Sequence, residues 1–233
     1  MEKRYFFEAY AVGFSSQIRR PFRHLIHVQA SSVVPSSGGF DRSRAREFCF
    51  EGLVRFDSAE TVVTGSATAD GNTFDTLSSA TIENLNILGQ VTADRVVAHM
   101  TSQYVRGTGY PKIIALGSRF EGLRIAGQPV DLDLSRSEHC RAPDDEYEGR
   151  RPEPLELTSL VTELPDLCGV SKSGNQYTIP HFGTISIADY LKTPYTRTLT
   201  MLRLELGSPF ENSSVVCEIG GGGIPYPPDN SGS

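Results

Sequence analysis

Apolar residues recur at every second position wherever this chain has a clear pattern. The segment LTMLRLEL (199–206) places leucines on one side and Arg203 and Glu205 on the other, and 4–14 and 24–30 alternate in the same way. A period of two is typical of half-buried strands in antiparallel sheets. Turn-forming residues separate such segments at 35–39, 69–72, 106–111, 126–129, 172–175 and 206–209. The pattern predicts an all-β fold, an antiparallel β-sandwich or barrel with bulged hairpins.

Composition agrees with this fold class. The chain has 233 residues, enough for one large all-β domain or two small ones, and its 22 Gly and 14 Pro imply many turns. Trp is absent, while β-branched and aromatic residues are plentiful, which favours strands. We expect at most one or two short helices. The candidate is 155–167, where apolar residues from Leu157 to Leu164 fall at helical spacing before Pro165.

The chain divides into four stretches by composition. Residues 1–134 are interpreted as a first β-rich part and 155–219 as the closing β-rich part of the same domain. Between them, 135–154 is charged, proline-bearing and without periodicity, which indicates a long loop, an insertion or a boundary between two sheet layers. The last stretch, 220–233, reads GGGGIPYPPDNSGS and is expected to be a tail with a glycine hinge.

One phrase occurs three times along the chain. IENLNILGQVTAD (82–94) and FEGLRIAGQPVDLDL (120–134) share the order of Glu, Leu, Ile and Gly-Gln, and FEGLVRF (50–56) is a shorter echo. The spacing is too irregular for a solenoid, so we expect matching hairpins of one sheet system. The alternative is a chance similarity among common residues.

Within the phrase, the alternation of apolar residues slips by one position. Leu85 is one position out of step with Ile82, and the residue before the Leu is Asn84, Gly122 or Gly52 in the three copies. Glycine and asparagine tolerate positive φ, which one common kind of β-bulge requires. The phrase is therefore interpreted as strand, bulge, strand and Gly-Gln turn.

The same region resembles a family of bacterial proteins called choice-of-anchor P. That family has a Leu-Gly pair followed by V-x-A-D, then a phrase F-x-G-L-x-[VI]-x-G-x-P-V, and the resemblance extends over about 60–230. It implies an exported, surface-associated, all-β protein with no catalytic residues to carry over. The matching positions are Leu88, Gly89, Val91, Ala93, Asp94, Phe120, Gly122, Leu123, Ile125, Gly127, Pro129 and Val130.

Charge argues against some functions. The formal net charge is −6, so nucleic acid is not expected as a partner. Residues 1–55 carry nine Lys or Arg against five Asp or Glu, while the remainder carries 13 against 23. This asymmetry suits head-to-tail self-contact, although ordinary solvated surface charge also accounts for it. No apolar run reaches 18 residues, so no membrane span is predicted, and the first residues do not form a signal peptide as written.

Four cysteines lie far apart in the sequence, with no CxxC pair. Buried free thiols are the first interpretation, and a Cys140–Cys168 disulfide in an oxidising compartment is the alternative. A structural metal would need closer ligand pairs, so no metal or other cofactor is expected. The four are Cys49, Cys140, Cys168 and Cys217.

No stretch matches a catalytic or cofactor-binding motif, and we assign no catalytic residue. A base or metal site would require His99 and His181 to converge with a carboxylate such as Asp94 or Asp189. The acidic run DDEYE (144–148) lacks the ligand spacing of a calcium loop and suits a solvated loop tip.

These observations favour a non-enzymatic, β-rich structural or interaction protein. Its expected partner is itself, as a homo-oligomer assembled through sheet edges, or another protein. The alternatives are a β-sandwich or barrel that binds a small apolar or glycan ligand, and a cryptic enzyme that uses His99 or His181 with a carboxylate.

Overall fold

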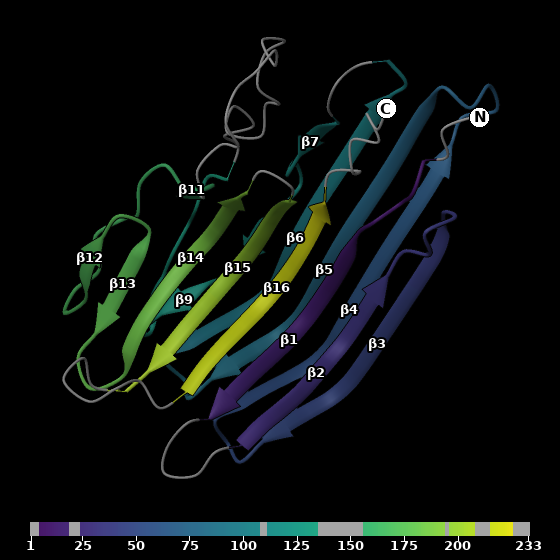
Figure 1. Cartoon of the computed structure of the whole chain (residues 1–233). Coiled ribbons are helices and arrows are strands. Elements are labelled where there is room, and N and C mark those ends of the chain that lie inside the picture. The colour runs from purple at the N-terminus through teal and green to yellow at the C-terminus, as the bar shows by residue number, and fades with distance from the viewer. Residues whose placement is uncertain are drawn as a thin grey trace.

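Two antiparallel sheets face each other in the computed structural model (Figure 1). We call them sheet A and sheet B. Strands β1, β2 and β16 of sheet A pack across β4, β5 and β6 of sheet B. The structure describes residues 5–18, 24–107, 111–134, 156–193, 196–207 and 215–225, the side chains of Ile18, His24 and 215–225 excepted.

Sheet A combines the two ends of the chain. Its order is β12-β13-β14-β15-β16-β1-β2, and β11 pairs with β14 beside this path. Because β1 pairs with β16, the amino-terminal hairpin completes a sheet whose other strands come last in the sequence. The bounds are β1 (Tyr10–Ile18), β2 (His24–Val33), β11 (Glu156–Ser159), β12 (Ser171–Ser173), β13 (Gln176–Ile179), β14 (Gly183–Lys192), β15 (Thr196–Leu206) and β16 (Val215–Pro225).

Sheet B is formed by consecutive strands. Its order is β10-β9-β6-β5-β4-β3, and the short strands β7 and β8 also pair with β6. The bounds are β3 (Gly39–Phe50), β4 (Val54–Ala67), β5 (Thr73–Ile87), β6 (Val91–Val105), β7 (Lys112–Ile114), β8 (Arg119–Glu121), β9 (Arg124–Ile125) and β10 (Gln128–Pro129). In the described part of the chain neither sheet closes on itself. The all-β antiparallel prediction is confirmed, and the arrangement is consistent with the sandwich rather than the barrel.

The helix expected over 155–167 is wrong. Residues Glu156–Ser159 form β11, which pairs with β14, and 160–167 contains no regular element. Leu160 and Leu164 are buried. These two leucines are therefore buried side chains of an irregular segment, 160–170, which we call the strap, and not part of one face of a helix. Among the described residues, no helix has the length and hydrophobicity needed to cross a membrane.

The glycine run expected to be a hinge is part of a central strand. Gly221, Gly222 and Gly223 lie in β16 between β1 and β15, which corrects the prediction for 220–225. Tyr10 and Thr198 both pair with Gly223, and their hydroxyl oxygens lie 3.5 Å apart. The tyrosine side chain thus reaches across the glycine strand, which covers backbone that glycine leaves bare. Residues 226–233 lie outside the described residues.

The strands of sheet B reverse their side-chain alternation at the same level, so the positions of reversal form one line across the sheet. On β5 the buried residues are at even positions up to Ile82 and at odd positions from Leu85, and Asn84 between them has φ +54°. At Asn84 the ladder with β4 skips two positions and the ladder with β6 skips one, but both keep their register. The residues on this line are Glu47 (φ +53°), Asp57, Asn84, Asp94 and Gly122 (φ +63°), all exposed.

Sheet A has a matching line, whose residues are buried wherever their burial is described. The ladders skip Ala188, Met201, Gly220, Gly13 and Ala30 in turn, and Ala30 and Ala188 have φ of +58° and +51°. A Cβ on Gly13 would lie 3.1 Å from the Cβ of Ala59, two residues from Asp57, so the two lines run close to each other on the facing sheets. Line residues point inward in sheet A and outward in sheet B. Both sheets therefore bend in the same direction along these lines and stay in contact. We call each line the crease of its sheet.

The repeated phrase belongs to this construction. Asn84 and Gly122 do reset the alternation, as predicted, but the β-bulge predicted at these two positions is wrong. No ladder shifts its register there, because the neighbouring strands reset at the same level. Both Gly-Gln turns are confirmed: Leu88-Gly89 and Ala126-Gly127 have positive φ in tight hairpins. Gly52 was wrongly interpreted. With Glu51 it forms the turn between β3 and β4, closed by the bond from Leu53 N to Phe50 O (2.8 Å).

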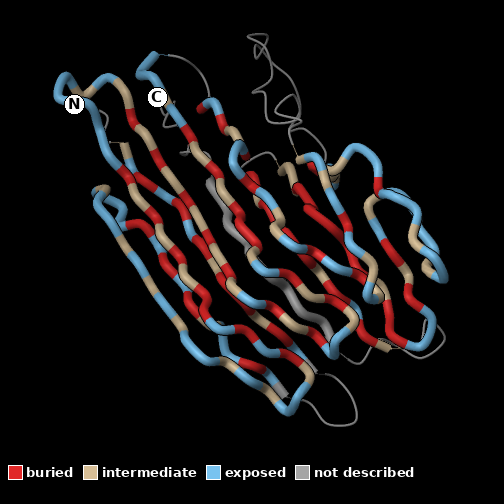
Figure 2. The backbone as a smooth tube through the Cα atoms, turned by 180° about the vertical axis from the view of Figure 1, so that it is seen from behind, coloured by how far each residue is buried: buried red, intermediate tan, exposed pale blue. Residues whose placement is uncertain are grey.

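The core has a thin part in which the two sheets approach each other closely. Buried and more exposed positions alternate along most strands (Figure 2). In the thin part a side chain as short as Ser78 donates to the Tyr10 carbonyl of the facing sheet (2.6 Å), and the hydroxyls of Ser32 and Thr61 are 2.7 Å apart. Facing sheets normally lie about 10 Å apart, so such direct bonds require a close approach. The inward residues here are small: Ala9, Ala11, Gly13, Ala59, Ala80 and Ala98.

The left-handed conformation of Asn84 predicts an unusual order of stability. Asn84→Gly and Asn84→Ala both lose the bond from Nδ2 to Asp57 Oδ2 (2.7 Å), but only alanine strains a left-handed backbone. We expect the alanine variant to be less stable by about 1 kcal/mol in urea denaturation. At Ser79, in a regular part of the same strand, glycine should be the less stable variant. If the glycine and alanine variants had the same order of stability at Asn84 and at Ser79, the left-handed conformation of Asn84 would be contradicted.

The close approach of the sheets predicts that Gly13→Ala is destabilising. The new Cβ would lie 2.7 Å from the Gln29 carbonyl oxygen and 3.1 Å from Ala59 Cβ. We expect a loss of about 1–3 kcal/mol of unfolding free energy, typical of overpacking. Adding Ala59→Gly should not restore stability, because the close contact of the new Cβ with the Gln29 carbonyl oxygen remains. The exposed control Ser31→Ala should stay within about 0.5 kcal/mol, and a neutral Gly13→Ala would refute the close approach.

Candidate functional sites: a charged face and an uncharged face

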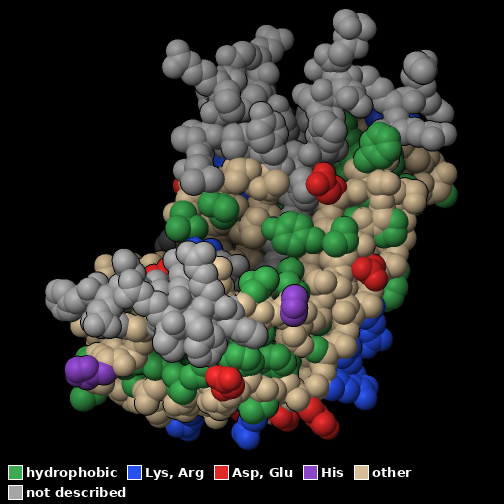
Figure 3. Space-filling model, turned by 60° about the horizontal axis from the view of Figure 1, so that its bottom comes forward, with side chains coloured by type: hydrophobic (Ala, Val, Ile, Leu, Met, Phe, Trp, Pro, Cys, Tyr) green, Lys and Arg blue, Asp and Glu red, His purple; other side chains and the backbone are tan. Residues whose placement is uncertain are grey.

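The outer face of sheet B carries a network of charged side chains. Glu60 accepts from Arg42 (2.8 Å) and lies 3.9 Å from Arg44. Further along, Arg95 bonds Glu83 (3.0 Å) and approaches a second glutamate, Glu121, to 3.8 Å. Most of the Lys and Arg side chains visible in Figure 3 lie along its lower and right-hand margins, the side of sheet B and of β3. Exposed pairs of this kind each contribute little to stability.

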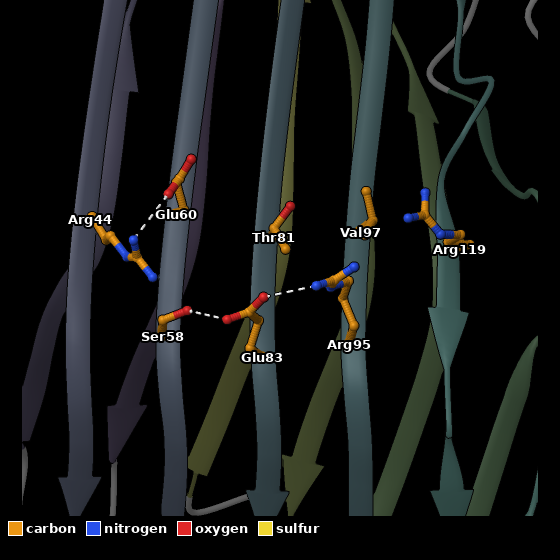
Figure 4. A pocket seen from close by; sticks show the side chains of 8 residues that line it. All are labelled: Arg44, Ser58, Glu60, Thr81, Glu83, Arg95, Val97 and Arg119. Carbon is orange, nitrogen blue, oxygen red and sulfur yellow. Dashed lines mark hydrogen bonds and ion pairs between the residues drawn. The ribbon is translucent and has the colours of Figure 1, made fainter.

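A shallow depression interrupts this network. Strand pairing places Arg44, Glu60, Thr81, Val97 and Arg119 in one row across the sheet. The two central side chains are short and those towards the ends are long, so the middle of the row is hollow (Figure 4). Ser58, Glu83 and Arg95 line the depression from the next row, and its volume is about 250 Å³. We call it the arginine-rimmed depression.

Hydrogen bonds favour the ionised form of the Glu83 carboxylate in the depression. The hydroxyl of Ser58 donates to Glu83 (2.9 Å), and this bond, followed by that from Arg95, lowers the pKa of Glu83. The bond to Glu60 raises the pKa of Arg42. At neutral pH the depression is therefore lined by three guanidinium groups and two carboxylates that already have partners.

The β1–β2 hairpin presents the opposite kind of surface. Its strands, 10–18 and 24–33, contain no Asp, Glu, Lys or Arg. Large apolar side chains nevertheless remain exposed there: Leu25 by 60%, Val28 by 48%, Val33 by 61% and Tyr10 by 38%. We call these four residues, with the polar side chains between them, the uncharged face. Contiguous apolar surface without charge is typical of interaction sites.

The two lateral edges of the sandwich differ as well. At the edge away from β2 and β3, the Gln128 amide exchanges two hydrogen bonds with the backbone of Cys168 (2.9 and 2.8 Å), which ties sheet B to the strap 160–170. The strands there are short, two to four residues each. At the other edge, β2 and β3 have 10 and 12 residues, and each pairs on one side only within the described chain. Arg42, Arg44 and Arg46 project from β3. Strand β2 has a bulge where it pairs with β1 between Phe14 and Ser16.

The structure does not bring the candidate histidines together. His99 lies half-buried on β6 in sheet B, beside Gly117, whereas His181 is exposed in the turn between β13 and β14 of sheet A. Asp94 lies on the crease of sheet B, and Asp189 is buried in β14, where it accepts from Asn175 (2.7 Å). The described residues contain no group of three or more potential metal ligands.

The cysteines depart from the expectation of buried thiols. Cys49 and Cys168 are both free and exposed. Cys140 and the acidic run 144–148 lie outside the described residues, as does the side chain of Cys217. Because Cys168 is a free thiol, the alternative of a Cys140–Cys168 disulfide is wrong for this structure.

Neither face was identified from the sequence, although the sequence contains a signal for one of them. The absence of charge from 10–18 and 24–33 is visible in the printed letters and was the signal for the uncharged face. The depression combines residues of five strands, from Arg44 to Arg119, and depends on strand register. No local pattern specifies that register across the whole sheet.

Comparison with known proteins identifies the family of this chain. The model of a domain of unknown function, DUF8256, matches residues 5–153. The chain belongs to this family. No curated protein and no solved structure matches it. The matched range includes all of sheet B and the β1–β2 hairpin but ends before β11, so the strands that flank the hairpin in sheet A lie beyond it.

The position of His99 predicts a contribution to acid sensitivity. Burial, followed by the charge of Arg119, lowers the pKa of His99 below its ordinary value of 6.5. The unfolded chain then binds the proton more readily, so this contribution to stability is complete above pH 6.5 and is lost as pH falls towards the folded pKa. We expect urea denaturation of His99→Gln to show a weaker decline in stability between pH 7 and pH 5 than the wild type. His27→Gln, at an exposed histidine, is the control; an unchanged decline in His99→Gln would contradict the prediction.

Proposed function

We propose that this protein is a non-enzymatic interaction protein that self-associates through the uncharged face of its β1–β2 hairpin. The observation that carries the proposal is the exposure of Tyr10, Leu25, Val28 and Val33 on two strands without a charged residue. A soluble surface normally carries charge, as the outer face of sheet B does. Interface cores, in contrast, are depleted of charge and enriched in aromatic residues.

A second copy of the chain is the partner that fits this face best. The face offers hydroxyl, amide and apolar groups but no charge, so it selects a partner surface that is equally uncharged. A two-fold axis through the hairpin would place two such faces against each other, so that the same residues of both copies form the contact. The charged outer face of sheet B cannot serve as that partner, because burying its arginines and glutamates would cost desolvation energy.

Edge pairing is a weaker route to the same assembly. The arginines of β3 face their own copies in a β3–β3 pairing, and like charges oppose it. The bulge of β2 disturbs a regular ladder. The predicted sheet-edge assembly is therefore refined here to face packing. Location at a cell surface, which the choice-of-anchor P resemblance implies, stays a prediction.

Sedimentation and light scattering over a concentration series test this proposal. We expect a dimer whose dissociation does not depend on salt, and we expect Val28→Lys combined with Val33→Lys to make it a monomer. Leu116→Lys and Leu157→Lys, at equally exposed leucines elsewhere (66% and 58%), are the matched controls and should stay dimeric. Circular dichroism should be the same for all variants, because the substituted side chains are exposed.

Two outcomes would refute the proposal. A wild-type monomer at every concentration would exclude self-association. A dimer that survives both lysines, or one that salt dissociates, would place the contact on charged surface instead.

A further inference from the structure

The arginine-rimmed depression has properties of a ligand site that the proposed self-association does not use. It lies on the outer face of sheet B, and the uncharged face lies on sheet A, the other layer of the sandwich. Thr81 and Val97 form its floor, and in Figure 4 charged side chains lie to the left of them, below them and to the right. An open, polar hollow of about 250 Å³ suits a small hydroxylated ligand and does not enclose an apolar one.

Two guanidinium groups of the rim retain hydrogen-bonding capacity. Arg44 approaches Glu60 only to 3.9 Å, beyond hydrogen-bonding distance. Arg119 uses Nε for Glu121 (2.7 Å) and one terminal nitrogen for the Gly117 carbonyl (3.3 Å), which leaves its other terminal nitrogen. In Figure 4 the Arg119 guanidinium points towards Val97, and that of Arg44 towards Glu60, so both face the hollow. Arginine donors in this position bind carboxylate or sulfate groups well.

The carboxylates of the depression are already engaged. Arg42 bonds Glu60, while Ser58 and Arg95 bond Glu83. Their remaining lone pairs can accept hydrogen bonds from neutral hydroxyl groups, and the Thr81 hydroxyl on the floor can donate or accept. The middle of the depression therefore suits hydroxyls, and its two ends suit negative charge.

We propose that the arginine-rimmed depression binds an acidic saccharide of one or two rings. Its carboxylate or sulfate groups lie on Arg44 and Arg119, and its hydroxyls lie on Thr81, Glu60 and Glu83. Arg44 on β3 and Arg119 on β8 are four strand intervals apart, about 19 Å between backbones at roughly 4.8 Å per interval. The two arginine side chains shorten this span from both ends, so a chain of one or two rings bridges it.

Calorimetric titration of the full chain with digalacturonate tests the proposal. Binding should occur with one site per chain, and Arg44→Gln and Arg119→Gln should each weaken it about tenfold, the usual effect of losing a charge-assisted hydrogen bond. Arg55→Gln, at an exposed arginine on the same face outside the depression, is the matched control and should leave affinity unchanged.

Three comparisons make the test decisive. The neutral sugar galactose should bind at least tenfold more weakly, and inorganic sulfate alone should also bind more weakly than digalacturonate. Equal binding of sulfate would reduce the site to an anion site and overturn the saccharide assignment. No binding of digalacturonate at millimolar concentration, or equal loss in Arg55→Gln, would overturn the site itself. The variants Arg44→Gln and Arg119→Gln should keep the oligomeric state of the wild type, so failure here is distinguishable from failure of the self-association proposal.

Discussion

The simultaneous reversal of side-chain alternation in neighbouring strands is the constraint on which the rest of this structure depends. A strand that reverses alone turns half of its apolar residues to solvent or shifts its register against its neighbours. Here Glu47, Asp57, Asn84, Asp94 and Gly122 reverse together in sheet B, and Gly13, Ala30 and Ala188 lie on the matching line of sheet A. Strands of up to 15 residues can therefore crease in the middle and still bury one side along their whole length.

The crease has a cost that the packing around it must offset. Left-handed conformations at Glu47, Ala30 and Ala188 are each unfavourable by about 1–2 kcal/mol. Close packing of small residues on both sides of the crease, with serine hydroxyls bonding directly across the sheets, holds these conformations in place. At Gly122 a Cβ would lie 2.1 Å from the Asp94 carboxylate, but that carboxylate ends an exposed side chain that can move aside. The φ of +63° therefore favours glycine at this position more than lack of space does.

The two outer faces divide the surface of the molecule by chemistry. Sheet B carries interlocked arginines and glutamates around a hollow, whereas strands β1 and β2 contain no Asp, Glu, Lys or Arg and expose Val28 and Val33. The family match covers both faces, since it extends from residue 5 to 153. The closing strands of sheet A, which lie beyond it, supply the partner for β1 and the facing layer for the core of sheet B.

The sequence by itself determined the fold class, because a period of two in hydrophobicity and frequent turn residues are local properties of the chain. It also located two crease positions, Asn84 and Gly122, since these residue types tolerate positive φ. Glu47, Ala30 and Ala188 have the same conformation without any such preference, so only their neighbours in the sheet decided it. The helix expected near Leu160 and the hinge expected at Gly222 failed for the same reason: pairing with β14, β15 and β1 outweighed local propensity. The depression between Arg44 and Arg119 likewise arose only when register aligned five strands, because side chains 75 positions apart meet through tertiary structure alone.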